Sequence, residues 1–359
     1  MTLCEHGVDF LELTAYCDDC ILPDGKELLS EKLLITTGND DNAMLCHFAQ
    51  LWGSQMNAKT DKPLPLGWCS WYFYFDKITE NDMIANADYI LANRNDYPLN
   101  LLQLDDGYQS ACGDWLQTNE KFPHGLKWLA DEIKRRGLTA GLWLAPFFAG
   151  QNSELYKNHP DWVVKNAQGE PIKTLDWRDG DLYALDGTHP EVQKHLSNLF
   201  RTIREIGFDY VKLDFMISAC NMPNGKYYDS TATRAQALRR GLQAIREGYI
   251  LGCTVPFGPT IGLVDGNRIS TDITPYWTMP QETNSEAPTV PNVCRNNINH
   301  TYMHRRLWIN DPDTLIAIDE VGFLESEAYL FQEKRVKTLV RCSKSGRRFA
   351  YAQRFIADS

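Results

Sequence analysis

Two aspartates that each end a short strand-like segment could carry out nucleophilic and acid–base chemistry. Asp214 lies in the run VKLDF at 211–215, two residues after Lys212, and Asp272 ends the run GNRISTD at 266–272. Cleavage of a glycosidic bond with retention of configuration needs one carboxylate as nucleophile and one carboxylic acid as proton donor, roughly 5 Å apart. A nearby cation favours an ionised carboxylate, so Lys212 suits Asp214 to the first role. Asp272 would be the acid, kept protonated by partial burial or by the charge of Asp214.

Other polar and aromatic side chains are expected at the ends of neighbouring predicted strands. Asp105 and Asp106 are adjacent carboxylates, which suit them to accept short hydrogen bonds from sugar hydroxyls. Arg268 could donate to a hydroxyl or orient the nucleophile. The residues that could converge on one site are Trp71, Asp105, Asp106, Trp143, Lys212, Asp214, Arg268 and Asp272.

Plainer roles compete with this hypothesis. A single aspartate at a strand end often caps a helix or pairs with a cation. Adjacent aspartates could also hold magnesium, and WINDPD at 308–313 adds two more acidic groups; such a barrel lyase or hydrolase would lose its activity to a chelator. No histidine falls at a predicted strand end, which disfavours a transition metal. We therefore predict no metal or organic cofactor, and we interpret the NDPD turn as structural, because Asp311 precedes a proline.

Short apolar runs alternate with helical patterns through most of the chain. Runs typical of strands lie at 66–73, 99–105, 139–145, 210–215, 249–255, 267–272 and 306–310, with an eighth candidate near 348–356. Amphipathic helices with apolar residues three and four apart are predicted at 80–94, 126–137, 189–207 and 234–248. This alternation predicts an α/β fold, a (β/α)8 barrel over 61–359, whose chemistry lies at the carboxyl ends of the strands.

Residues 1–60 have a different pattern. Alternating runs such as VDFLELTAY and KLLITTG, separated by the turn segments PDGKE and GNDDN, predict antiparallel strands. We interpret this part as the C-terminal portion of an N-terminal β-sandwich domain.

Composition limits the partners and the compartment. A net charge of -11 disfavours nucleic acid and anionic membranes, whereas a neutral small oligosaccharide is compatible with it. Ten tryptophans and sixteen tyrosines supply faces for sugar rings as well as for the core. The ten cysteines follow no disulfide framework, and no apolar stretch is long enough to span a bilayer. These features predict a cytoplasmic protein with reduced thiols, and they leave homo-oligomer formation open.

The order of these motifs resembles the α-galactosidases of glycoside hydrolase family 36, which are retaining (β/α)8-barrel enzymes. The resemblance covers about residues 64–320. It rests on GWCSWYFYF at 67–75, LQLDDGYQ at 102–109, GDWLQTNEKFPHGLKWLADEIKRRGLTAGLWLAPF at 113–147, HPDWVVKN at 159–166, LYALDGTHPEV at 182–192, VKLDF at 211–215, LGC at 251–253, DGNRISTDITPYW at 265–277 and RLWINDPD at 306–313.

The resemblance implies a role for each site residue. Asp214 would be the nucleophile and Asp272 the acid/base residue. Asp105 and Asp106 would bind the hydroxyls that distinguish galactose from glucose, and Lys212 and Arg268 would bind other ring hydroxyls. Trp143 and Trp71 would form walls, and Cys253 would line the site. The resemblance implies no metal or organic cofactor, and a terminal α-galactosyl residue of a melibiose- or raffinose-type sugar as substrate.

Some features differ from the family pattern. Ser270 and Thr271 precede Asp272, where members usually carry Gly-Pro. Members also have a complete β-sandwich before the barrel and a β-domain after it, so this chain is expected to be shortened at both ends. The segment 344–359 fits a last barrel strand poorly.

Alternative functions remain open from the sequence. The same chemistry could serve an α-N-acetylgalactosaminidase or a galactosyl transferase of the raffinose-synthase kind. A non-catalytic sugar-binding barrel is a different class, which the presence of both carboxylates disfavours.

Overall fold

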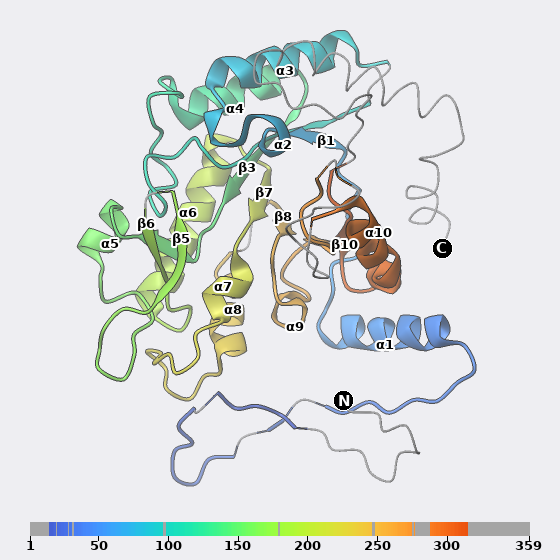
Figure 1. Cartoon of the computed structure of the whole chain (residues 1–359), viewed down its shortest axis with the longest axis vertical. Coiled ribbons are helices and arrows are strands. Elements are labelled where there is room, and N and C mark those ends of the chain that lie inside the picture. Colours follow the sequence, from blue (N-terminus) through green and yellow to red (C-terminus); the bar gives the residue numbers. More distant parts are fainter. Residues whose placement is uncertain are drawn as a thin grey trace.

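A parallel sheet of seven strands organises the chain (Figure 1). The computed structural model describes residues 14–314 except 19, 28, 31, 96–97, 179, 246–247, 275 and 277–287. In sheet order the strands are β1 (Gly67–Cys69), β2 (Leu101–Leu104), β3 (Thr139–Leu144), β7 (Tyr210–Leu213), β8 (Tyr249–Gly252), β9 (Gly266–Arg268) and β10 (Ile309–Asp311). Every neighbouring pair is parallel, so all seven carboxyl ends lie along one rim.

The sheet curls until the residues that follow its two edge strands meet. Tyr72, three residues after β1, donates its hydroxyl proton to Asp313, two residues after β10, at 2.6 Å. An open, flat sheet would hold these groups several strand spacings apart. The curl is that of a (β/α)8 barrel, and the α/β fold predicted from the sequence is confirmed. The eighth strand expected near 348–356 lies outside the described residues.

Helices follow the strands and cover the outer face of the sheet (Figure 1). The long ones are α3 (Glu80–Ala92), α4 (Gly125–Arg135), α6 (Pro190–Ile206) and α8 (Arg234–Gln243), at the four predicted positions. In α6 the buried residues recur three and four apart, from Val192 and Leu196 to Phe200 and Ile203. Central strands such as β3 are buried from Ala140 to Leu144, which explains their continuous apolar run.

The remaining elements are short. Helical turns are α2 (Trp71–Tyr74), η1 (Phe75–Lys77), α5 (Glu154–Asn158), α7 (Met216–Cys220), α9 (Phe257–Thr260) and η2 (Thr301–Met303), and α10 (Val290–Asn299) precedes β10. A second, antiparallel sheet has the order β4-β6-β5 and consists of β4 (Phe148–Gly150), β5 (Lys173–Trp177) and β6 (Gly180–Ala184). It occupies the segment between β3 and α6.

All seven described strands of the parallel sheet are shorter than predicted, and for two of them the difference places a site residue in another kind of element. The first, expected at 66–73, ends at Cys69, and Trp71 begins helix α2. Ser70 adopts a helical conformation, and its hydroxyl accepts from the Asp105 backbone N–H at 2.9 Å, which turns the chain away from the sheet. The strand expected at 267–272 ends at Arg268, so Asp272 lies in the following loop rather than at a strand end.

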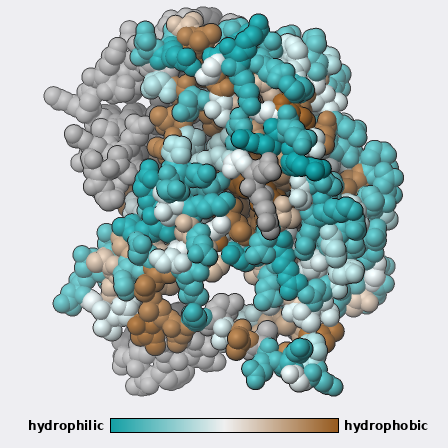
Figure 2. Space-filling model, turned by 180° about the vertical axis from the view of Figure 1, so that it is seen from behind, coloured by the Kyte–Doolittle hydropathy of each residue, from teal (hydrophilic) through white to brown (hydrophobic). Residues whose placement is uncertain are grey.

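The N-terminal part departs from its predicted structure. KLLITTG at 32–38 forms no strand, and α1 (Asp41–Gln55) follows, capped by the Asp40 side chain, which accepts from Ala43 N–H. Leu45 and Leu51 on α1 are each more than 40% exposed. Figure 2 shows apolar side chains gathered at lower left, where α1 lies in this reversed view. Among the described helices, none is both long and apolar enough to cross a membrane. The domain division at residue 60 stays a prediction.

Gly187, in the loop between β6 and α6, provides a test of how closely α8 packs against that loop. A Cβ at this position would lie 2.1 Å from the Ala237 carbonyl oxygen on α8, so an alanine must push α8 outward. We expect Gly187→Ala to lower the free energy of unfolding by about 1–3 kcal/mol, measured by urea denaturation. The matched control is Gly258→Ala in α9, where a Cβ meets nothing closer than 3.5 Å and should cost nothing. Equal stability of the two variants would contradict the close packing.

Candidate functional site

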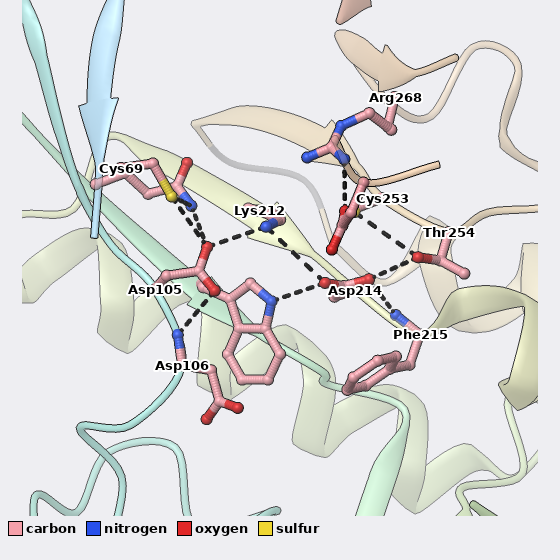
Figure 3. Close-up of polar contacts among 12 residues, drawn as sticks. Cys69, Asp105, Asp106, Lys212, Asp214, Phe215, Cys253, Thr254 and Arg268 are labelled. Atoms are coloured by element: carbon pink, nitrogen blue, oxygen red, sulfur yellow. Dashed lines mark hydrogen bonds and ion pairs between the residues drawn. The ribbon is translucent and has the colours of Figure 1, made fainter. Parts of the chain in front are cut away.

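The site is organised around the buried ammonium of Lys212, which Figure 3 shows between Asp105 and Asp214. Lys212 lies in β7, and its side chain is 5% exposed. Its Nζ is 3.0 Å from Asp105 Oδ2 and 3.9 Å from Asp214 Oδ2. One cation therefore serves two carboxylates that follow two different strands.

Asp105 takes part in this network through both of its carboxylate oxygens. Its Oδ2 accepts from Lys212, from Gln103 Nε2 at 2.7 Å and from the Cys69 thiol at 3.3 Å. Its Oδ1 accepts from the Asp106 backbone N–H at 2.9 Å. Donors of this kind allow a carboxylate to be buried, and Oδ1, which has one donor, can accept a second hydrogen bond. Asp105 thus fixes the direction in which Asp106 leaves the strand.

Asp214 is held as a carboxylate by donors on three sides. It accepts from Trp143 Nε1 at 2.9 Å, from the Phe215 backbone N–H at 2.7 Å and from Thr254 Oγ1 at 2.9 Å. Burial raises its pKa, but Lys212 and these hydrogen bonds outweigh burial, so the pKa of Asp214 lies below its ordinary value. The side chain is 13% exposed, so a substrate can still reach it.

The backbone around Asp214 turns sharply. Phe215 and Thr254 have positive φ angles of 57° and 50°, which residues other than glycine rarely adopt. The turn at Phe215 directs its N–H back to the Asp214 carboxylate, and the turn at Thr254 brings its hydroxyl there. Strain of this kind persists where surrounding contacts enforce it, and it is common at functional sites.

Asp106 faces a different set of donors, two of which come from β5 and the turn that follows it. Its carboxylate accepts from Gln109 Nε2 at 2.7 Å and from Trp177 Nε1 at 2.8 Å, and Arg178 Nε lies 2.9 Å away. Burial raises the pKa of Asp106 to about 6, against the opposing effect of the Gln109 and Trp177 hydrogen bonds. Asp105 and Asp106 are adjacent in sequence but differ in their partners.

Trp177 and Arg178 were not predicted from the sequence. Arg178 pairs with both Asp106 and Asp76, and it lies over the rings of Trp71 and Trp177, 5.7 Å from each centroid. Trp71 therefore reaches the site through helix α2 and through aromatic contact with Trp177, 6.2 Å between ring centroids. The WRDG sequence at the turn between β5 and β6 was the only available signal.

Arg268 anchors the opposite side of the site. It is buried at the end of β9, and its guanidinium contacts Asp272 at 2.7 Å, Asp313 at 2.9 Å and Asp311 at 3.4 Å. The Asp272 side chain is 52% exposed, and its contacts are Arg268 and the Tyr72 hydroxyl at 3.3 Å. The sequence suggested the charge of Asp214 as the neighbour of Asp272, and the structure adds a direct ion pair between Asp272 and Arg268.

The Cys253 thiol lies within reach of the charges of both Asp214 and Arg268. Burial raises the pKa of its thiol, the charges of Asp214 and Asp272 raise it further, and Arg268 and Lys212 oppose them. All nine residues singled out from the sequence thus belong to one connected network. Throughout the part of the chain that the structure describes, no group of three or more histidine, cysteine, aspartate or glutamate side chains is arranged to hold a metal ion.

A curled parallel sheet with aspartates, a lysine and tryptophans at its carboxyl rim defines an α/β-barrel protein with its chemistry at that rim. The family model described as Melibiase matches residues 58–247, and the chain belongs to this family.

Relatives and solved structures agree with this assignment. α-Galactosidase 2 of Pediococcus pentosaceus is 28% identical over 192 residues, 51% of this chain and 25% of the relative. An A type blood α-D-galactosamine galactosaminidase of Flavonifractor plautii is 32% identical over 169 residues, 44% of this chain and 15% of the relative. The α-galactosidase TtGalA of Thermus thermophilus superposes with a TM-score of 0.66 at 30% identity, over 79% of this chain and 59% of that one. The chain thus spans a quarter or less of these two curated relatives.

The buried ion pair makes Lys212 the site residue whose loss should be costliest to the fold. Lys212→Met keeps the length of the side chain but leaves Asp105 as an unpaired buried charge. We expect the free energy of unfolding to fall by about 3–5 kcal/mol, measured by urea denaturation at pH 7. Lys134→Met is the control, because its ion pair with Asp209 is exposed and should contribute less than about 1 kcal/mol. Similar losses in both variants would show that the buried ion pair contributes no more to stability than the exposed one.

Proposed function

We propose that the chain is a retaining glycoside hydrolase that removes terminal non-reducing α-D-galactosyl residues from α-galactosides such as melibiose. The observation that carries the proposal is Asp214, a carboxylate kept ionised by Lys212 and three hydrogen bonds and still accessible at the rim. A carboxylate in this state can attack an anomeric carbon.

The reaction would proceed in two displacements. Asp214 attacks the anomeric carbon, the glycosidic C–O bond breaks, and the leaving oxygen takes a proton from Asp272. A water molecule then attacks the same carbon while Asp272 accepts one of its protons, and the bond to Asp214 breaks. The two inversions restore the α configuration, and Asp272 and Asp214 return to their initial states.

The surrounding residues would bind the sugar. Asp105 and Asp106 accept from ring hydroxyls, Lys212 and Arg268 donate to others, and Trp143, Trp71 and Cys253 form the walls. Because Asp106 is already paired with Arg178, the two together present an acceptor and a donor to adjacent hydroxyls. TtGalA, at 30% identity, is recorded in complex with p-nitrophenyl α-D-galactopyranoside and with stachyose, which supports this substrate class.

A second substrate is favoured by one relative. The Flavonifractor plautii protein is named for an amino sugar, α-D-galactosamine. The two sugars differ only at the second carbon of the ring, so parallel assays with the 4-nitrophenyl α-glycosides of galactose and galactosamine decide between them. The N-acetylgalactosamine glycoside tests the alternative considered from the sequence.

The role of Asp214 is tested by azide rescue. We expect the parent to hydrolyse 4-nitrophenyl α-D-galactoside and Asp214→Ala to lose at least about 1,000-fold in kcat, because the variant has no nucleophile. Added azide should restore turnover of the variant and yield β-galactosyl azide, identified by NMR. A folded but inactive parent would exclude this activity for the chain, and an α-azide product would exclude the assigned nucleophile.

The ionisation of Asp214 sets the acidic side of the pH profile. Its pKa lies below the ordinary value, partly because Thr254 donates to the charged form, so removing that donor must raise the pKa. For Thr254→Val we expect the acidic limb of kcat/KM to move to higher pH by about 0.5–1, since one such hydrogen bond contributes about 1 kcal/mol. Thr260→Val, a buried threonine whose hydroxyl donates only to the backbone, should leave the limb in place. A shift to lower pH in Thr254→Val would contradict the assignment.

A further inference from the structure

Asp313 is a buried carboxylate in contact with the acid/base side of the site, and it belongs to the NDPD turn that we interpreted as structural. Its side chain is 1% exposed. The titratable groups that face it are Arg268, Asp311, Asp272 and Tyr72. Burial raises the pKa of Asp313, and Arg268 opposes that effect. The ion pair with Arg268, at 2.9 Å, is the contact that stabilises its charge.

Asp313 and Asp272 share the same two donors. Arg268 presents one terminal nitrogen to Asp272 at 2.7 Å and the other to Asp313 at 2.9 Å. The Tyr72 hydroxyl has a single proton and lies 2.6 and 2.7 Å from the two Asp313 oxygens but 3.3 Å from Asp272. Asp313 therefore accepts the hydrogen bond from the Tyr72 hydroxyl and pairs with one terminal nitrogen of the Arg268 guanidinium.

This division of donors matters for an acid catalyst. A carboxyl group that must deliver a proton to a leaving oxygen works poorly when many donors stabilise its charged form. If Asp313 lost its charge, Tyr72 and Arg268 would both be free to turn toward Asp272. Its carboxylate would gain donors and hold a proton less readily.

We propose that Asp313 is a positioning residue that competes with Asp272 for Arg268 and Tyr72, and so keeps Asp272 able to protonate the leaving group. The inference rests on the proposed function and adds a residue that does not touch the reacting atoms. Asp313 is also fixed by the Ile273 backbone N–H, which donates to it at 2.7 Å and ties it to the loop that carries Asp272.

The test is the dependence of the variant's activity on the leaving group. 4-Nitrophenol leaves with little help from an acid, whereas the glucose of melibiose needs full protonation. We expect Asp313→Asn to lose about 100-fold in kcat/KM on melibiose but only about 5-fold on 4-nitrophenyl α-D-galactoside. The alkaline limb of the melibiose profile should also move to lower pH, because the variant's Asp272 would lose its proton more easily.

Two further variants separate this role from a structural one. Asp265→Asn makes the same change at another buried aspartate, at the opposite end of β9, and should affect both substrates equally or not at all. Tyr72→Phe removes the donor that Asp313 holds and offers no new donor to Asp272, so its loss should differ little between the two substrates. If Asp313→Asn fails to fold by circular dichroism, Asp313→Glu replaces it, with the same bias toward loss on melibiose expected from its displaced carboxylate.

The outcomes are distinct. A folded parent inactive on both substrates would overturn the proposed function and this inference with it. An active parent whose Asp313 variant loses equally on both substrates, with an unchanged alkaline limb, would overturn the inference alone. A selective loss on melibiose together with the shifted limb would support it.

Discussion

The ammonium of Lys212 is the charge on which the rest of the site depends. Removing an ammonium from water costs several kcal/mol, and here Asp105 and, more distantly, Asp214 offset that cost. Because these carboxylates follow β2 and β7, with β3 between them, the lysine links three neighbouring strands at their rim. Trp143 of β3 completes the link by donating to Asp214. The contacts that allow the charges to be buried are thus the same ones that keep Asp214 ionised.

Sequence patterns correctly located the buried strands and the long helices. Buried parallel strands are mostly apolar, with Gln103 and Lys212 as exceptions, so the first carboxylate after such a run marks the rim, as Asp105 and Asp214 do. The pattern was misleading for β1 and β9, which have three residues each. There the polar residue expected at the strand end lies in a helix, as Trp71 does, or in a loop, as Asp272 does. Strands this short carry too few residues for alternation to define their ends.

The residues that sequence patterns missed act through distant contacts. Trp177 reaches Asp106 across 71 residues, and Tyr72 reaches Asp313 across 241. Neither contact leaves a local signal, because each depends on how the sheet curls and on where the antiparallel sheet packs. The strand prediction for residues 32–38 was wrong for another reason. Its short apolar runs suit a strand or an amphipathic element equally, and periodicity over seven residues such as KLLITTG does not separate the two.

The contact between Tyr72 and Asp313 has a consequence for synthesis of the protein. A chain made from its N-terminus exposes Tyr72 and both Asp105 and Asp106 long before Asp313 leaves the ribosome. The charged rim therefore stays unpaired on one side while most of the barrel is already translated. Contact between the residues that follow the two edge strands is thus one of the last steps in the folding of the sheet.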